Sequence, residues 1–394
     1  MSADLSRVPA SPWREGAVVV EPVRGRRDLT AFVRFPYRLH RDDVDWVPPW
    51  ERERRAFLDR RRNPFFDYGD VELYLARRGG EVVGRVAAVD NPRHNDFHGT
   101  RHGFFGLFDC VDDVEVAGAL FAAAAGWLRR RGLDAVLGPT DFSTNRECGL
   151  LVDGFGSPPA ILMPHNPPYY PALLEACGFA KAKDLWAWDL DVARGLPERT
   201  ARVADAVLRR AGVSVRPVDL GDFAGEVERV RELYNASWAR NWGFVPMTDR
   251  EFRCLAAELR RVVRPELALV AEVGGEPVGF GLSLPDMNQA LRAVGGRLGR
   301  YGSPGAWLRL WRAARRVRRV RILALGVREG YRGRGVDVAL TVGMVRAARR
   351  LGYTDGEVSW TLEDNRAANR VAEYLGATRS RTYRIYQRPL GGEG

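Results

Sequence analysis

The stretch VRILALGVREGYRGRGVDVALTVGMVRAARRLG (residues 320–352) decides the fold class. It opens with an apolar run, Ile322 to Val327, whose length and composition predict a buried strand. A loop rich in glycine and arginine follows, and then a helical pattern that ends at Gly352. A strand, a glycine loop and a helix in this order predict an α/β fold.

The loop is suited to bind an anion. The first turn of a helix offers unpaired N–H groups and the positive end of the helix dipole. Gly333 and Gly335 would let the backbone come close to such a ligand, and Arg332 and Arg334 would add positive charge. These residues alone are equally compatible with an ordinary connection whose arginines are solvated.

A second segment, EDNRAANRVAEYLGA (residues 363–377), follows a predicted strand from Glu357 to Thr361. Together the two segments resemble the GNAT superfamily of acyltransferases. Its loop reads R/Q-x-x-G-x-G/A, and its next helix reads N-x-x-A with a glycine eleven residues after the asparagine. The matching positions are Arg332, Gly335, Asn365, Ala368 and Gly376.

The resemblance implies an acyl-CoA thioester as co-substrate, no metal, and transfer of the acyl group to an acceptor such as an amine. In this family the strand before the loop splays away from its neighbour, so that free backbone groups bind the pantetheine arm of coenzyme A. The implied coenzyme A site comprises Leu325, Gly326, Val327, Arg332, Gly333, Arg334, Gly335, Val336, Asp337, Val338, Asn365 and Asn369.

Two positions depart from the family pattern. Asp337 stands where the loop usually ends in glycine or alanine, and we interpret it as a helix cap, the alternative being a carboxylate that faces the phosphates. Ala372 stands where many members place a tyrosine that protonates the leaving thiolate. Tyr374 is the predicted substitute, with Tyr383 and Tyr386 as further candidates, although each could simply be a packing residue.

A repeated hairpin indicates that the chain is duplicated. The segments VELYLARRGGEVVGRVAAV and ELALVAEVGGEPVGFGLSL begin at residues 71 and 266, about 195 residues apart, and each reads as two strands joined by a Gly-Gly turn. We expect a tail over residues 1–16, a GNAT-like domain over 17–190, a linker helix over 191–212 and a GNAT domain over 213–390.

The first unit is predicted to be degenerate. Its turn from strand to helix, LFDCVDDVEVAGAL (residues 107–120), carries four acidic residues between Asp109 and Glu115 and no glycine before Gly118. Such a turn could not cradle a diphosphate well. By resemblance to tandem GNAT proteins, one half would bind the acyl donor and the other would shape the acceptor pocket.

The acceptor is expected at a polar loop of the first unit, GPTDFSTNRECGLLVDGFGSPPAILMPHNPPYY (residues 138–170). An amine attacks a thioester only when it is unprotonated, so a base is needed; Glu147, Asp141 and His165 are the candidates, and Asp141 is also a candidate to bind the acceptor. The side chains predicted to orient the acceptor are Asn145, Asn166, Tyr169 and Tyr170. The alternative is that these groups satisfy buried loop backbone.

Composition limits the other possibilities. The four cysteines show no Cys/His ligand spacing, which argues against a metal site, and no secretory signal or membrane-spanning run is apparent, so we expect a cytoplasmic protein. The net charge of +11 favours an anionic partner.

Residues 297–321 hold nine arginines and no acid. At helical spacing Trp307 and Trp311 share a face with Leu310, Ala314 and Val317. The helix over residues 304–321 could lie on an anionic membrane at its inner face, or its tryptophans could pack on the second core. Nucleic acid is an unlikely partner because no reading motif accompanies the charge.

Over nearly its whole length the chain resembles a group of bacterial two-domain GNAT proteins with GFFG, GPxxFSTNxExG, MPxNPPYY and RGRGxD segments. This group includes proteins similar to bacterial ceramide synthases, which transfer a long acyl chain to the amine of a sphingoid base. The leading hypothesis is therefore a long-chain acyl-CoA N-acyltransferase. The alternatives are a short-chain N-acetyltransferase of a small amine or peptide, and a non-catalytic module that binds coenzyme A or a membrane.

Overall fold

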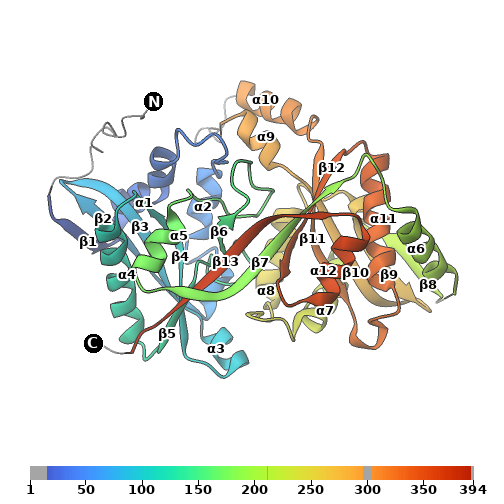
Figure 1. The fold of residues 1–394 in the computed structure, drawn as a ribbon, viewed down its shortest axis with the longest axis horizontal. Coiled ribbons are helices and arrows are strands. Elements are labelled where there is room, and N and C mark those ends of the chain that lie inside the picture. The colour runs from blue at the N-terminus through green and yellow to red at the C-terminus, as the bar shows by residue number, and fades with distance from the viewer. Residues whose placement is uncertain (1–15, 211, 296–303, 392–394) are drawn as a thin grey trace, which may run out of the picture.

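The computed structural model describes residues 16–210, 212–295 and 304–391. Their strands form one continuous mixed sheet, which helices cover on both faces (Figure 1). The order of the strands along this sheet is β1-β2-β3-β4-β5-β13-β7-β12-β11-β10-β9-β8, and β6 pairs with β13 beside this path. The predicted α/β fold with a mixed sheet is confirmed.

The first part of the chain supplies the elements on one side of the sheet. Its strands are β1 (Val18–Pro22), β2 (Asp70–Arg78), β3 (Glu81–Asp90), β4 (His102–Cys110), β5 (Ala135–Gly138), β6 (Leu150–Asp153) and β7 (Ala180–Asp191). Its helices are α1 (Gly25–Leu39), α2 (Glu51–Phe57), the 3₁₀ turn η1 (Pro64–Asp67), α3 (Pro92–His98), α4 (Val114–Arg129) and α5 (Tyr170–Ala176).

The second part repeats this order from the opposite edge of the sheet. Its strands are β8 (Val213–Pro217), β9 (Ala268–Val273), β10 (Glu276–Pro285), β11 (Arg319–Val327), β12 (Asp355–Leu362) and β13 (Thr378–Pro389). Its helices are α6 (Glu198–Arg210), α7 (Phe223–Trp238), α8 (Asp249–Leu259), η2 (Pro265–Leu267), α9 (Asn288–Ala293), α10 (Pro304–Ala314), η3 (Glu329–Tyr331), α11 (Val336–Arg350) and α12 (Arg366–Tyr374).

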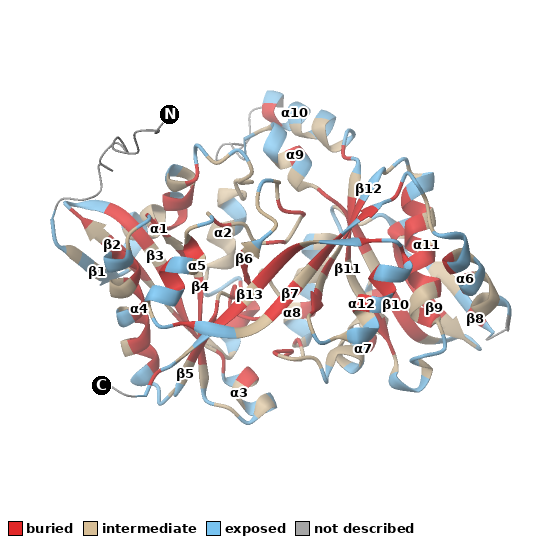
Figure 2. Ribbon diagram, in the orientation of Figure 1, coloured by how far each residue is buried: buried red, intermediate tan, exposed pale blue. Residues whose placement is uncertain are grey.

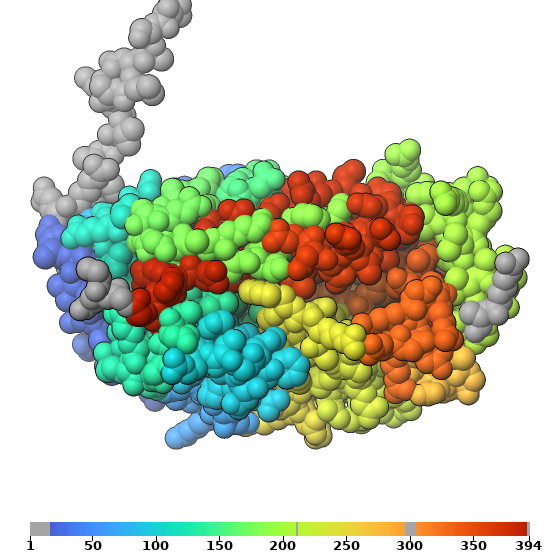
Figure 3. Space-filling view, turned by 60° about the horizontal axis from the view of Figure 1, so that its bottom comes forward, coloured from blue at the N-terminus to red at the C-terminus, as the bar shows by residue number. Residues whose placement is uncertain are grey.

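The two parts exchange their last strands. β13, the end of the second part, pairs with β5 of the first, whereas β7, the end of the first part, pairs with β12 of the second. β7 and β13 also pair with each other across the middle of the molecule, where the green and red segments lie side by side in Figure 3. Neither part therefore completes its sheet with its own chain. The division at residues 190 and 213 stays a prediction.

Each part has its own hydrophobic core, and a long helix lies at its centre. α4 buries Leu120, Phe121 and Leu128 in the first core, and α11 buries Leu340 and Met344 in the second (Figure 2). These residues follow helical spacing, so each helix presents one apolar face to the sheet. In each half the strand that precedes the long helix, β4 or β11, packs against this core.

Within the described ranges no helix combines the length and the apolar character needed to cross a membrane. The same residues contain no group of three or more His, Cys, Asp or Glu side chains arranged to hold a metal ion.

Candidate active site

The strand β11 separates from its parallel neighbour β12 halfway along its length. The ladder between them joins Arg319–Ile322 to Asp355–Val358, and the rest of β11 runs on without a partner on that side. On its other side β11 stays paired with β10 as far as Val327. The splay implied by the family resemblance is therefore present, and it leaves one edge of the backbone of Leu325, Gly326 and Val327 facing the gap.

The glycine loop leads from this free edge into α11. Gly333 and Gly335 have left-handed backbones, with φ of 72° and 81°, and Gly335 is the N-cap of the helix. The first intrahelical bond of α11 runs from the N–H of Ala339 to the carbonyl of Gly335. The N–H groups of Val336, Asp337 and Val338 thus lie at the positive end of the helix, where an anion is stabilised.

The two arginines of the loop have different roles. Arg332 donates from Nη2 to the carbonyl of Ser237, at 2.7 Å, and from Nε to that of Val327, at 3.2 Å. It therefore fixes the loop between β11 and α7 as well as bringing charge. Arg334 is exposed and lies over the ring of Tyr331, so its guanidinium is the more accessible partner for a phosphate.

Asp337 does not cap α11, contrary to our interpretation. The cap position is occupied by Gly335, and no side-chain hydrogen bond closes this end of the helix. Asp337 lies in the first turn, where its negative charge is stabilised by the helix dipole. It therefore remains a carboxylate near the predicted phosphate position.

The asparagines of the following helix take separate positions. Asn365 caps α12 by accepting a hydrogen bond from the N–H of Ala368 at 3.1 Å. Asn369 is buried and donates to the carbonyls of Leu362 and Glu363, while its Oδ1 has no partner among the described residues. A buried oxygen without a donor is costly, so Asn369 is well suited to receive a ligand N–H such as a pantetheine amide.

The three candidate tyrosines lie in different surroundings. Tyr374 ends α12 with 55% of its surface exposed, and its role as the catalytic acid stays a prediction. Tyr386 donates to Glu175 at 3.2 Å. Tyr383 is fully buried and its hydroxyl is unpaired within the described structure, which makes it the one of the three with a free polar group in the interior.

The carboxylates of the polar loop line a cavity of about 140 Å³ in the first half. Arg54 of α2 donates to both: Nη2 to Glu147 at 2.9 and 3.0 Å, and Nη1 to Asp141 at 2.7 Å. Burial raises the pKa of Asp141, and the neighbouring charge of Glu147 adds to this rise, while Arg54 opposes it. The polar loop thus places two carboxylates against one guanidinium, and the pKa of one of them, Asp141, is raised.

His165 lines the same cavity. Its Nε2 lies 2.8 Å from Oδ2 of Asp43, so the ring is held in one orientation. Burial alone would raise the pKa of Asp43, but the hydrogen bonds from His165 and from the backbone of Asp45 outweigh it and lower the pKa. The cavity is lined by residues of the first half, and none of residues 323–338 is among them.

Contacts through α7 nevertheless connect the polar loop to β11. Asn145 donates to the carbonyl of Val245 and accepts from the hydroxyl of Tyr234 at 2.8 Å. Tyr234 packs against Trp238, and a Cβ on Gly326 would lie 2.7 Å from the ring of Trp238. Asn145 therefore joins the two halves, and its role in orienting an acceptor stays a prediction.

Three further predicted acceptor residues also have structural partners. Asn166 accepts from the N–H of Leu151 at 2.7 Å and donates to its carbonyl. Tyr169 donates to the carbonyl of Cys110 at 2.8 Å, and Tyr170 accepts from the N–H of Cys110 at 2.9 Å. These side chains satisfy backbone groups that would otherwise be buried without partners, as the alternative stated above expects, and a role in orienting the acceptor stays a prediction.

Two tyrosines occupy backbone groups at the end of β4 in the first half. β4 pairs with β5 only from His102 to Phe104, so β4 splays from its neighbour as β11 does. At its end, the N–H and carbonyl of Cys110 are the groups that would meet a pantetheine arm. Tyr169 and Tyr170 occupy both of them.

We therefore expect one molecule of coenzyme A to bind per chain. Isothermal titration should give a stoichiometry near one for the wild type. It should also do so for Tyr169→Phe, because the acidic turn after β4 would still repel the phosphates. A stoichiometry of two would contradict this account of the first half.

A buried ionic network at the strand exchange was missed by the sequence analysis. Glu357 of β12 is fully buried and accepts from Arg319 and Arg381, both at 2.9 Å. Its other oxygen accepts from Ser359, which in turn accepts from Nε of Arg321 at 2.8 Å. The hydrophobic pattern of the sequence could not reveal this buried network, because charged residues within a strand usually indicate a face exposed to solvent.

Asp286, just after β10, extends this network to the polar loop. It accepts from the N–H of Ile161 at 2.9 Å and from that of Asn288 at 3.2 Å. Burial raises the pKa of Asp286 to about 6, although the nearby positive charge of Arg319 acts to lower it. The network therefore fixes the loop of residues 157–161 against the start of β11.

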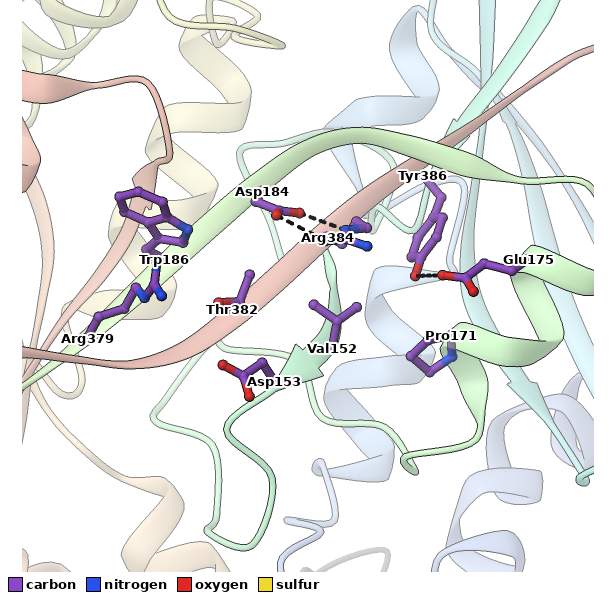
Figure 4. A pocket seen from close by; sticks show the side chains of 10 residues that line it. All are labelled: Val152, Asp153, Pro171, Glu175, Asp184, Trp186, Arg379, Thr382, Arg384 and Tyr386. Carbon is purple, nitrogen blue, oxygen red and sulfur yellow. Dashed lines mark hydrogen bonds and ion pairs between the residues drawn. The ribbon is translucent and has the colours of Figure 1, made fainter.

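A larger and shallower cavity, of about 410 Å³, lies where β7 and β13 cross (Figure 4). Its central charges satisfy each other: Arg384 donates to both oxygens of Asp184, at 2.8 and 3.1 Å, and Tyr386 donates to Glu175.

Comparisons with known proteins agree with this geometry. The acetyltransferase (GNAT) family matches residues 227–377. The bacterial ceramide synthase of Caulobacter vibrioides is 38% identical over 378 residues, which cover 94% of this chain and 97% of that protein. Protein YghO of Escherichia coli K12 is 34% identical over 383 residues, which cover 94% of this chain and 95% of that protein.

Solved structures share the whole two-part architecture. A tandem GNAT protein from the clavulanic acid biosynthesis pathway has a TM-score of 0.57 at 15% identity, covering 96% of this chain and 100% of its own. A GCN5-related N-acetyltransferase from Sphaerobacter thermophilus has a TM-score of 0.52 at 16% identity. The match covers 95% of this chain and 96% of that protein. At such identities the likeness concerns the fold. The chain belongs to the acetyltransferase (GNAT) family, and it is an acyltransferase with two units of that fold in tandem.

Proposed function

We propose that this acyltransferase transfers a long acyl chain from coenzyme A to the amine of a sphingoid base, as a ceramide synthase does. The observation that carries the proposal is the free edge of β11, which leads through the glycine loop to the N-terminus of α11. The specific acceptor is suggested by the relative named bacterial ceramide synthase, which aligns along 94% of this chain. We further propose that the reaction takes place in the cytoplasm, at the inner face of the membrane.

The donor would lie along β11. In this proposal the phosphates bind at the first turn of α11 beside Arg334, and the pantetheine amides pair with the free backbone of Leu325 and Val327 and with Oδ1 of Asn369. Donors fixed in this way can polarise the thioester carbonyl without reorganising during the reaction. The amine nitrogen then forms a bond to the carbonyl carbon, the carbon–sulfur bond breaks, and the amine gives up a proton while the thiolate takes one.

Glu147 is our candidate for the proton acceptor. Glu147 lines a polar cavity, and Arg54 holds its carboxylate in place. It belongs to the same loop as Asn145, which contacts Tyr234 of α7, the helix packed against β11. The ring of His165, oriented by Asp43, is the alternative base in the same cavity. Among the candidate acids, Tyr374 is exposed and Tyr383 is fully enclosed.

Turnover with defined substrates tests the proposal. Purified protein is incubated with sphinganine and either palmitoyl-CoA or acetyl-CoA, and the amide product is measured by mass spectrometry. We expect N-palmitoyl product and little N-acetyl product. Acetylation of small amines without palmitoyl transfer would identify a short-chain N-acetyltransferase instead. Coenzyme A binding without any turnover on a panel of amines would identify a non-catalytic module.

Glu147→Gln should lower kcat by about 100-fold, because a neutral amide cannot accept the proton of the amine. Affinity for palmitoyl-CoA, measured by titration, should stay at the wild-type value. Glu175→Gln, a carboxylate of the other cavity, is the matched control and should leave kcat unchanged. Equal kcat for Glu147→Gln and the wild type would exclude Glu147 as the base.

A further inference from the structure

The helix α10 exposes large apolar side chains to solvent. Trp307, Leu308 and Trp311 have 44%, 46% and 50% of their surface exposed. The buried side chains of this region are instead those of Ala306, in the helix, and Val317, just after it. Packing of the tryptophans on the second core, one of the two arrangements left open by the sequence, is therefore wrong.

The same surface is strongly basic. Arg309, Arg312, Arg315 and Arg316 are exposed on α10 and the turn after it, and Cζ of Arg315 lies 3.6 Å from the ring centroid of Trp311. The chain contains no acidic residue from 287 to 328. This stretch of the chain therefore presents tryptophans and arginines without an acidic residue among them, on the helix labelled α10 at the top of Figure 1.

This surface continues onto the first half near the polar cavity. Trp50, which precedes α2, meets Trp307 edge to face at 5.9 Å, and Arg52 lies over the ring of Trp50. Pro49, the residue before Trp50, lines the cavity that contains Glu147. The exposed aromatic rings therefore lie beside the wall of the candidate acceptor cavity.

We propose that α10 docks the protein on an anionic lipid bilayer. The docking surface comprises Trp307, Leu308, Trp311, Arg312, Arg315 and Arg316. Tryptophan rings are favoured at the boundary between headgroups and acyl chains, and arginines pair with lipid phosphates. Duplex nucleic acid would satisfy the arginines but leave the apolar rings in water. The link to catalysis rests on the proposed lipid acceptor, whereas docking itself does not depend on turnover.

Vesicle sedimentation tests this surface directly. Full-length protein is mixed with vesicles of phosphatidylcholine alone or with 30% phosphatidylglycerol added, roughly a cellular anionic fraction. We expect sedimentation with the anionic vesicles and weak sedimentation with the neutral ones. Each arginine near the surface contributes about a fivefold factor, so Arg312→Glu with Arg316→Glu should reduce partitioning by at least about 25-fold. Trp307→Ala with Trp311→Ala should also reduce it.

A charge-matched variant separates local docking from overall charge. Arg26→Glu with Arg27→Glu changes two exposed arginines at the first turn of α1 and should bind vesicles like the wild type. Palmitoyl-CoA titration should be unchanged in all variants, which keeps a failure of docking distinct from a failure of the enzyme. The proposal is overturned if wild-type protein stays in the supernatant with anionic vesicles, if both charge variants bind equally, or if duplex DNA binds α10 and vesicles do not.

Discussion

Glu357→Gln is expected to lower the free energy of unfolding by about 3–5 kcal/mol, the usual cost of removing one partner from a buried ionic network. Glu357 is completely buried and is the shared acceptor of Arg319 and Arg381. Burial already lowers the pKa of Arg321, and Glu357 is the main group that opposes this effect. Without the carboxylate, the arginines at the strand exchange would lose their shared buried acceptor. Equilibrium guanidinium unfolding measures the change.

The matched control is Glu258→Gln, which breaks an ion pair with Arg146 on the surface and should cost less than about 1 kcal/mol. A second variant, Glu357→Gln with Arg381→Gln, removes one negative and one positive group. It should recover part of the loss, because less charge remains uncompensated in the interior. If Glu357→Gln cost no more than Glu258→Gln, the network would not stabilise the contact between the halves.

The parts of the site that could be predicted are those encoded by short segments. Gly333 and Gly335 adopt the left-handed backbone that the loop requires, and Asn365 caps its helix three residues before Ala368. Such features depend on neighbours within one turn of chain, so spacing alone identifies them. The repeated hairpins likewise predicted β2 and β3, and β9 and β10.

The features that could not be predicted join residues far apart in the chain. Arg54 lies 93 residues before Glu147, and Tyr169 lies 59 residues after Cys110, so no local pattern connects them. The exchange of β7 and β13 depends on strand pairing across the whole molecule, which periodicity does not encode. An amphipathic helix such as α10 has an apolar face whether it packs on a core or stays exposed, so the place of Trp307 had to come from the structure.

Alanine substitutions at three glycines of the donor loop should weaken palmitoyl-CoA binding in a fixed order. Gly330 has no left-handed backbone and room for a Cβ, so Gly330→Ala should bind like the wild type. Gly333 has φ of 72° with open space around it, and Gly333→Ala should cost about 1 kcal/mol, close to fivefold in affinity. Gly335 has φ of 81°, and its Cβ would lie 2.6 Å from Val207 of α6.

Gly335→Ala is therefore expected to weaken binding most, by about 100-fold, because both the backbone strain and the contact with Val207 would move the first turn of α11. Calorimetric titration measures the affinities, and thermal unfolding shows whether each variant remains folded. Val207→Ala in the Gly335→Ala background removes the contact but not the strain, so it should restore affinity to the level of Gly333→Ala. Equal affinities for all three alanine variants would mean that the phosphates do not bind at the start of α11.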